Sequence, residues 1–403
     1  MSVPIGPSVA QTTLLDGMCV LDATQVMAGP YCTMVLCDMG ARVIKVEPPG
    51  GDSSRVMAGS TGTESAAFNA VNRGKLGIVL DLHQPAARDV FRRLARTADV
   101  LVENYRPGVM ARLGLDYATL AQENPRLVYA SISGYGQTGP SASKGGFDLV
   151  AQGASGIMSV TGEPGRPPVK AGLPLTDLGA GLFALAAILA AVHWRSSSGR
   201  GQYIDTSLFE AGIALSVWEA TEYFSGRTPA PLGSAHRMSA PYQAFRCADG
   251  YVTVGAANDR AFAKLAPLLG HPEWLADPRF SADAERLRNR EELASAIEAV
   301  MATGTRAEWL ARFEAAGIPS GPINDYAQVF ADPQVAAREM VVEVDHPVLG
   351  RLRGLGSPVK MSDTPLNPRR RAPRLGEHTD EVLLAAGIGD EELRQMRATG
   401  AVR

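Results

Sequence analysis

The first 133 residues alternate between short runs rich in β-branched residues and stretches in which apolar residues recur with helical spacing. This alternation predicts strands at 17–24, 41–49, 75–82, 99–105 and 126–133, with helices at 28–40 and 84–98. Strands that are separated by helices pair in parallel, and helices then cover both faces of the sheet. The sequence therefore predicts an α/β fold built on a parallel sheet.

The pattern changes after about residue 200. Residues 201–224 are predicted to be helical, and a loop rich in Pro and Gly follows at 228–241. A hairpin with its turn at Asp249-Gly250 is predicted within 242–256. Charged amphipathic helices are then predicted from 259 to 316. We infer that this part of the chain forms a separate unit.

A chain of 403 residues is long enough for two domains. The predicted organisation is a large domain in 1–224, a smaller α+β domain in 225–320 and a return to the large domain in 321–403. Antiparallel strands within 342–362 and a last helix at 379–388 are predicted in the returning part.

Charge and composition narrow the classes of partner. The chain carries 39 Lys and Arg residues against 42 Asp and Glu residues, so nothing indicates nucleic acid or an anionic membrane as a partner. Four cysteines without a CxxC pair predict reduced thiols in a cytoplasmic protein. The six histidines have no metal-ligand spacing, so no metal is predicted. Residues 1–13 lack the features of a secretory signal.

Residues 133–139, SGYGQTG, match the glycine pattern of dinucleotide-binding loops. Gly134, Gly136 and Gly139 follow a predicted strand, but Pro140 stands where the helix of that motif should begin. A nicotinamide site is therefore disfavoured. A tight turn that brings backbone N–H groups toward a ligand is the preferred interpretation.

Two other segments follow predicted strands, at the edge where open α/β sheets bind ligands. The junction 24–34, TQVMAGPYCTM, is as compatible with a simple turn as with a binding site. In 102–114, Arg106 and Arg112 could meet a phosphate group, although two solvated arginines are the simpler interpretation.

Asp177 stands just before a long uncharged run, 178–194. The run is short for a membrane span and rich in Ala and Gly, so it predicts a buried core helix. Thr176-Asp177 is the usual signature of a helix N-cap. A helix N-terminus also stabilises negative charge, so Asp177 should stay ionised. An ionised carboxylate in a dry pocket could act as a nucleophile toward an acyl group, with nearby N–H groups stabilising an oxyanion.

Eight segments, in order, resemble the signatures of the class III CoA-transferases of the CaiB/BaiF type, the family of formyl-CoA:oxalate and carnitine CoA-transferases. They are LDATQVMAGPYCTMVLCDMGARVIKVEPPGGDSSR, NRGKLGIVLDL, DVLVENYRPGVMARLGL, YASISGYGQTGP, GGFDLVAQGASGIMSVTG, LPLTDLGAGLFALAAILAA, GRGQYIDTSLFE and RLGEHTDEVL. The resemblance extends from about residue 14 to residue 385.

The resemblance implies an interlocked homodimer, with a Rossmann-like large domain that binds CoA and a small domain over the active site. It implies that Asp177 is the catalytic aspartate. The family's CoA-binding positions fall on Gln25, Val26, Met27, Ala28, Leu80, Asn104, Tyr105 and Arg112, with Phe147 at an aromatic position near the pantetheine. The candidate substrate contacts are Gly136, Asp148, His236 and Arg237.

Departures from the family patterns narrow the expected activity. The racemases of the family carry histidine at the position of Phe147, and phenylalanine cannot move a proton. Formyl-CoA members often have glutamine at the position of Met27 and a run of glycines where this chain has GSAHRMSAP, 233–241. This loop is closer to that of members that use succinyl-CoA and dicarboxylic acids.

The resemblance thus predicts a cytoplasmic CoA-transferase that moves CoA from an acyl-CoA, such as succinyl-CoA, to a carboxylic acid through an aspartyl anhydride and an aspartyl-CoA thioester. CoA would be a substrate, with no permanently bound cofactor. Arg237 could hold the distal carboxylate of a dicarboxylic acid, or it could be solvated. The alternatives are an acyl-CoA racemase or isomerase of the same family and a non-catalytic CoA-binding protein.

Overall fold

The computed structural model describes residues 13–57, 60–62 and 64–403. Residues 1–12, which make up most of the segment analysed for a secretory signal, lie outside this range. The described chain divides into two compact units. The first takes in residues up to Met158, together with Lys170–Ser225 and Pro333–Arg403, and the second comprises Ser159–Val169 and Gly226–Asp332.

The division differs from the predicted domain limits at three places. The chain leaves the first unit after Ser225, one residue beyond the predicted limit at 224, but returns to it only at Pro333 instead of at 321. The later return has a structural reason, because β9 (Ser320–Pro322) pairs with β8 (Gly250–Gly255) inside the second unit. Residues 159–169 also belong to the second unit.

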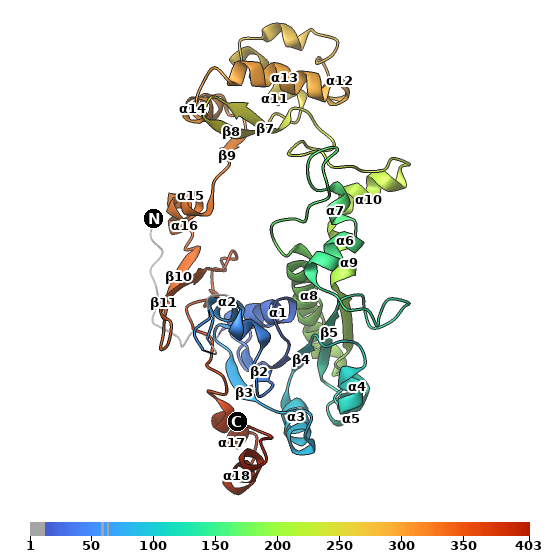
Figure 1. Cartoon of the computed structure of the whole chain (residues 1–403), viewed down its shortest axis with the longest axis vertical. Coiled ribbons are helices and arrows are strands. Elements are labelled where there is room, and N and C mark those ends of the chain that lie inside the picture. Colours follow the sequence, from blue (N-terminus) through green and yellow to red (C-terminus); the bar gives the residue numbers. More distant parts are fainter. Residues whose placement is uncertain (1–12, 58–59, 63) are drawn as a thin grey trace. The chain divides into compact units, whose positions relative to one another are not determined.

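A six-stranded sheet in the order β3-β2-β1-β4-β5-β6 forms the centre of the first unit (Figure 1). All neighbouring strands are parallel, so the predicted parallel α/β sheet is confirmed. The strands are β1 (Cys19–Ala23), β2 (Arg42–Glu47), β3 (Leu76–Val79), β4 (Val100–Glu103), β5 (Val128–Ser133) and β6 (Tyr203–Ser207).

Strand β6 corrects the helix predicted over 201–224. Residues Tyr203–Ser207 pair in parallel with β5, and helix begins only with α9 (Leu208–Leu215) and α10 (Val217–Phe224). Ser207 ends the strand and caps α9, because its hydroxyl accepts a hydrogen bond from the N–H of Glu210. The alternating burial of β6 is the pattern of an edge strand, which the apolar residues after Ser207 obscured.

Two apolar clusters cover the two faces of the sheet, and successive residues of β1 divide between them. Leu21 belongs to the cluster that includes α3 (Pro85–Thr97) and the C-terminal helices, and Val20 to the cluster that includes α1 (Ala28–Asp38) and α8 (Leu175–Ser198). This is the two-sided coverage expected of a parallel sheet.

The predicted helix at 379–388 is α17 (Thr379–Ala385), but it is not the last helix. The final helix is α18 (Asp390–Ala398), which was not predicted from the sequence. Its Leu393 and Met396 pack into the same cluster as α3, and Leu80 forms a bridge with Val402. The shorter elements of the first unit are η1 (Ser53–Val56), α2 (Ala66–Asn72), α4 (Val109–Leu113), α5 (Tyr117–Glu123), α6 (Asp148–Ala154), α16 (Pro333–Ala337), β10 (Val341–His346) and β11 (Gly350–Leu355). Helix α7 (Ile157–Val160) contains the division point after Met158.

The second unit contains a three-stranded antiparallel sheet and its own apolar core. In its hairpin Cys247 pairs with Gly250, so the connecting residues are Ala248 and Asp249, one position before the predicted turn. The elements are β7 (Tyr242–Cys247), β8, α11 (Asp259–Leu268), η2 (Pro272–Leu275), α12 (Asp283–Arg288), α13 (Arg290–Met301), α14 (Arg306–Ala316), β9 and α15 (Tyr326–Ala331).

Helix α8 is long and apolar enough, by length and composition, to cross a membrane, and it is the one such helix in the described ranges. It packs against α1 and α9 in the first unit. Ala184 and Ile188 are buried in the cluster on that face of the sheet, whereas Phe183 and Trp194 are exposed. The predicted core helix is therefore buried on one face only in the single chain.

Candidate active site

A pocket of about 410 Å³ lies at the carboxyl ends of β1, β4 and β5. The strand order reverses between β1 and β4, which is the position where open α/β sheets bind ligands. The pocket is lined by Gln25, Val26, Met27, Ala28, Ser53, Asn104, Tyr105, Arg106, Pro107, Ile132, Ser133, Gly134, Lys144, Gly145, Gly146, Phe147, Asp177 and Leu208.

The pocket brings together eight of the candidate site residues from separate segments of the sequence. They are Gln25, Val26, Met27, Ala28, Asn104, Tyr105, Phe147 and Asp177. Asn104 also joins two of these segments, because its amide accepts a hydrogen bond from the N–H of Gln25 and donates one to the carbonyl of Gln25, both at 2.8 Å. The loops after β1 and β4 are thereby fixed to each other.

Six other candidate residues do not line this pocket, among them Asp148. Leu80 is a core residue with 1% exposure, and Arg112 is exposed in the last turn of α4. Gly136 donates its N–H to the hydroxyl of Ser133 within a turn. His236 and Arg237 lie in the second unit.

Inside the second unit, His236 and Arg237 contact their own loop and its neighbours. The ring of His236 stacks on Tyr242 with 4.7 Å between centroids. The guanidinium of Arg237 donates to the carbonyl of Ala230 at 3.0 Å. Both residues lie in the segment 228–241, which was predicted to be a loop.

Two cationic side chains in the pocket fit anionic groups of a ligand. Arg106 lies three residues after β4. It was considered with Arg112 as a phosphate contact, although two solvated arginines were the preferred interpretation. Lys144 was missed, because it lies eleven residues beyond the end of the predicted strand 126–133 and no local pattern marks it. Arginine and lysine are the usual partners of phosphate oxygens. No group of three or more His, Cys, Asp or Glu side chains in the described part of the chain is arranged to hold a metal ion.

Gly134 and Gly146 allow two backbones of the pocket wall to touch. A Cβ atom on Gly146 would lie 2.4 Å from the Cα of Gly134, and one on Gly134 would lie 2.7 Å from the Cα of Gly146. Gly134 therefore serves close backbone packing. No helix begins directly after Gly139, because the next helix, α6, starts only at Asp148. The nicotinamide motif requires a helix at that position.

Asp148 supplies the cap of α8, and the predicted N-cap role of Asp177 is wrong. Helix α8 begins at Leu175, and Asp177 lies in its first turn. One carboxylate oxygen of Asp148 accepts hydrogen bonds from the N–H of Thr176 at 3.0 Å and from its hydroxyl at 2.7 Å. A carboxylate from another helix thus satisfies the helix start. The Asp177 side chain is left available to the pocket.

The surroundings of Asp177 make its carboxylate unusually basic. Burial raises the pKa of Asp177 to about 6, and the negative charge of Asp148 contributes in the same direction. The expected ionisation of Asp177 therefore holds only above this pKa, because burial and the Asp148 charge both favour the protonated form. A carboxylate with a raised pKa is still ionised above pH 6 and is a stronger nucleophile than an exposed one.

The sheet and the pocket at its switch point define an α/β protein with a candidate site that is suited to an anionic ligand. The chain belongs to CoA-transferase family III, whose family model matches residues 15–379. Proteins of this class move CoA between carboxylic acids, and the chain is accordingly a CoA-transferase.

Named relatives and a solved structure match along nearly the whole chain. The acetyl-CoA:oxalate CoA-transferase of Acetobacter aceti is 42% identical over 90% of this chain and 93% of its own length. The human succinyl-CoA:glutarate CoA-transferase is 39% identical over 92% and 85%. A crystal structure of a CaiB/BaiF family protein from Brucella suis is 40% identical and has a TM-score of 0.82, covering 93% of this chain and 100% of that one.

Proposed function

We propose that this protein transfers CoA from succinyl-CoA or a similar acyl-CoA to a small carboxylic acid, with Asp177 as the covalent nucleophile. The observation that carries the proposal is a buried carboxylate, relieved of helix capping by Asp148, in a pocket at the switch point of the sheet. The relatives' names, which pair succinyl-CoA with glutarate and acetyl-CoA with oxalate, support the substrate class.

The proposed reaction conserves the thioester's free energy by passing through two covalent forms of Asp177. The carboxylate attacks the thioester carbonyl of the donor, the C–S bond breaks, and a mixed anhydride and the CoA thiolate form. The thiolate then attacks the aspartyl carbonyl, which gives an aspartyl-CoA thioester and releases the donor acid as its carboxylate. The acceptor carboxylate reverses both steps and leaves as the new acyl-CoA.

The residues around Asp177 support this sequence in different ways. Arg106 and Lys144 are suited to the phosphate groups of CoA. Water must be excluded while the anhydride exists, and the apolar lining residues Met27, Ile132 and Leu208 contribute to a dry wall. No histidine is among the residues that line the described pocket, and Phe147 occupies the racemase position. The lining therefore offers no imidazole for removing and returning an α-proton.

The acid specificity is testable with a panel of donors and acceptors. We expect succinyl-CoA with C4 or C5 dicarboxylates to give the fastest exchange, at least tenfold above monocarboxylates, because a second carboxylate can be bound by a fixed cation. Mass spectrometry of the CoA products measures this. Equal rates for mono- and dicarboxylates would contradict the proposed specificity, and absence of exchange with every donor would contradict CoA transfer itself.

Arg237 is the proposed contact for the distal carboxylate, so Arg237→Met is the variant to compare in the same panel. Its KM for succinate should rise about tenfold or more while its KM for a monocarboxylate changes little, since a bidentate ion pair is lost only for the dicarboxylate. Similar KM changes for both acids would contradict a role of Arg237 in binding the acid. They would not contradict the proposed transfer of CoA.

The pH dependence follows from the raised pKa of Asp177. We expect kcat/KM to rise with pH up to about 6 and then to level off, because Asp177 must be ionised to attack. Asp148→Asn removes the like charge and keeps a carbonyl oxygen for Thr176, so the acidic limb should move to lower pH. pH–rate profiles of both proteins measure the shift. An unmoved limb would show that Asp177 is not the titrating group.

We also propose that two copies of the chain associate. Large apolar side chains are exposed on three consecutive helices: Leu182, Phe183, Trp194, Leu215, Val217, Trp218 and Phe224. Exposed apolar surface of this kind is typical of a protein interface. Sedimentation at micromolar concentration should give the mass of two chains, and a monomer at that concentration would contradict the proposal.

A further inference from the structure

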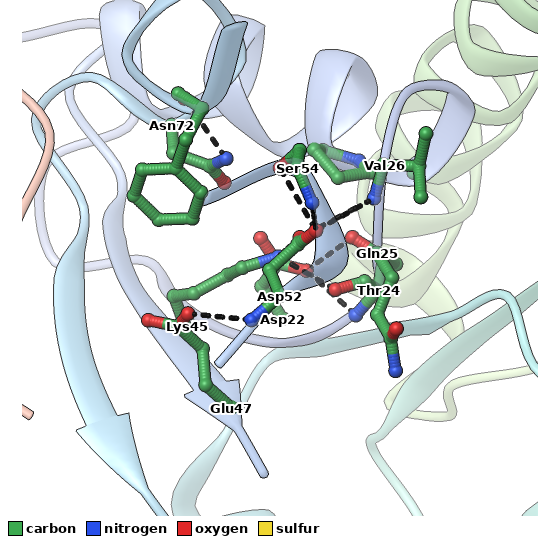
Figure 2. Close-up of polar contacts among 12 residues, drawn as sticks. Asp22, Thr24, Gln25, Val26, Lys45, Glu47, Asp52, Ser54 and Asn72 are labelled. Atoms are coloured by element: carbon green, nitrogen blue, oxygen red, sulfur yellow. Dashed lines mark hydrogen bonds and ion pairs between the residues drawn. The ribbon is translucent and has the colours of Figure 1, made fainter. Parts of the chain in front are cut away.

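A network of buried charges lies beneath residues 24–28, the loop that contributes four side chains to the pocket (Figure 2). Lys45 and Asp52 form an ion pair of 2.9 Å, and both side chains are fully buried. Lys45 also donates to the carbonyl of Thr24 at 2.6 Å. A second ion pair, Asp22 with Lys75 at 2.8 Å, is also fully buried.

Val26 in this loop has a backbone conformation that valine avoids. Its φ is +67°, and Val26 and Glu339 are the two non-glycine residues with positive φ in the described ranges. A β-branched residue in the left-handed region is strained, and such strain persists only where the surroundings enforce it. The conformation of Val26 therefore needs a structural cause.

Asp52 supplies that cause. The N–H of Val26 points between the two carboxylate oxygens of Asp52, at 3.3 Å from each (Figure 2). The same carboxylate accepts from the N–H and hydroxyl of Ser54, which fixes it over η1, and the N–H of Asp52 donates to Glu47. The preceding residue, Gln25, is held by Asn104. The left-handed residue is thus fixed from both sides.

A stability role alone does not account for this arrangement. Burying an ion pair costs desolvation free energy that a well-packed apolar pair avoids. Burial alone raises the pKa of Asp52, but Lys45 and the Ser54 N–H outweigh it and hold the pKa below the ordinary value, so the carboxylate keeps its charge. The charged acceptor strengthens the bond to the strained N–H.

We propose that Asp52, oriented by Lys45, is a positioning residue that keeps Val26 left-handed and so sets residues 25–28 for binding acyl-CoA. The identity of the ligand rests on the proposed function. Asp52 does not line the pocket itself, whereas its neighbour Ser53 does. Asp52 therefore acts through the loop conformation and does not contact the reacting atoms.

The test compares Asp52→Asn in two backgrounds. In the native background the variant should raise the KM for acyl-CoA about 30-fold with a smaller change in kcat, because the strained N–H of Val26 loses its charged acceptor. In the Val26→Gly background the same substitution should raise the KM for acyl-CoA about threefold or less, because glycine adopts positive φ without strain. Equal losses in both backgrounds would overturn the inference.

Asp38→Asn is the matched control, because it breaks another buried pair of the same unit, Asp38 with Arg73. It should lower Tm with little change in KM, and a KM increase as large as that of Asp52→Asn would overturn the positional role. If Asp52→Asn does not fold, Asp52→Glu, which keeps the charge but displaces the acceptor, is compared in both backgrounds. Calorimetric titration of the native protein with CoA distinguishes failure of the positioning role from failure of the proposed function. If the native protein does not bind CoA, the proposed function is contradicted.

Discussion

Replacing Asp177 by alanine should abolish CoA transfer, with a loss of about 10⁴-fold or more in kcat, while CoA still binds. The loss is large because no other group in the pocket lining is placed to form the anhydride, and removal of a covalent nucleophile leaves only binding effects. Binding should persist because Arg106, Lys144 and the loop after β1 are untouched. Exchange of labelled acid into acyl-CoA and calorimetric CoA titration measure the two properties.

The same experiment has a chemical counterpart. Hydroxylamine or borohydride added during turnover should modify the native protein at Asp177, because both the anhydride and the thioester are acyl derivatives of that carboxylate. Peptide mass spectrometry locates the modification, and the alanine variant is the control. Retained exchange in Asp177→Ala, or trapping at a different residue, would contradict the nucleophile role.

Gly146→Ala should cost about 100-fold in kcat/KM for acyl-CoA. The new Cβ would lie 2.4 Å from the Cα of Gly134, so one of the two backbones must move by about 1 Å to restore ordinary contact. A displacement of this size in a binding site typically costs about two orders of magnitude in rate. Steady-state kinetics measure the loss, and overpacking should also lower Tm by a few degrees.

Gly145→Ala is the neighbouring comparison. Its Cβ would meet the end of the flexible Arg106 side chain at 3.0 Å, which can move aside more easily than a backbone atom. We expect a loss of at most about tenfold for this variant. If the two alanine variants lose the same activity, close packing between the two backbones is not what shapes the pocket wall.

The parallel sheet was predictable because each of its first five strands is a short β-branched run next to a helical stretch. The sixth strand was not, since Tyr203–Ser207 precedes a long apolar helical pattern that dominated the segment. Helix α18 was missed for the opposite reason. It is strongly polar, and Leu393 and Met396 can be recognised as core residues only from their packing in the cluster that includes α3.

The candidate site was predictable where a segment follows a strand, as in 25–28 and 104–105. Lys144 and Ser53 lie on loops whose path depends on the packing of distant residues, and no local pattern marks them. The resemblance to the family located Asp177, whereas local sequence alone favoured a cap. Only the structure shows that Asp148, 29 positions earlier, caps α8 in its place.

The alternation of strands and helices could be predicted from the sequence, because side-chain periodicity and turn residues act over a few positions. The sequence also carried the ordered signatures of the family. Tertiary structure decided which carboxylate caps and which faces the pocket, how basic Asp177 is, and why Val26 is left-handed. Those properties arise from contacts between residues far apart in the chain, whose distances and burial are set only when the sheet and its two covering layers have formed.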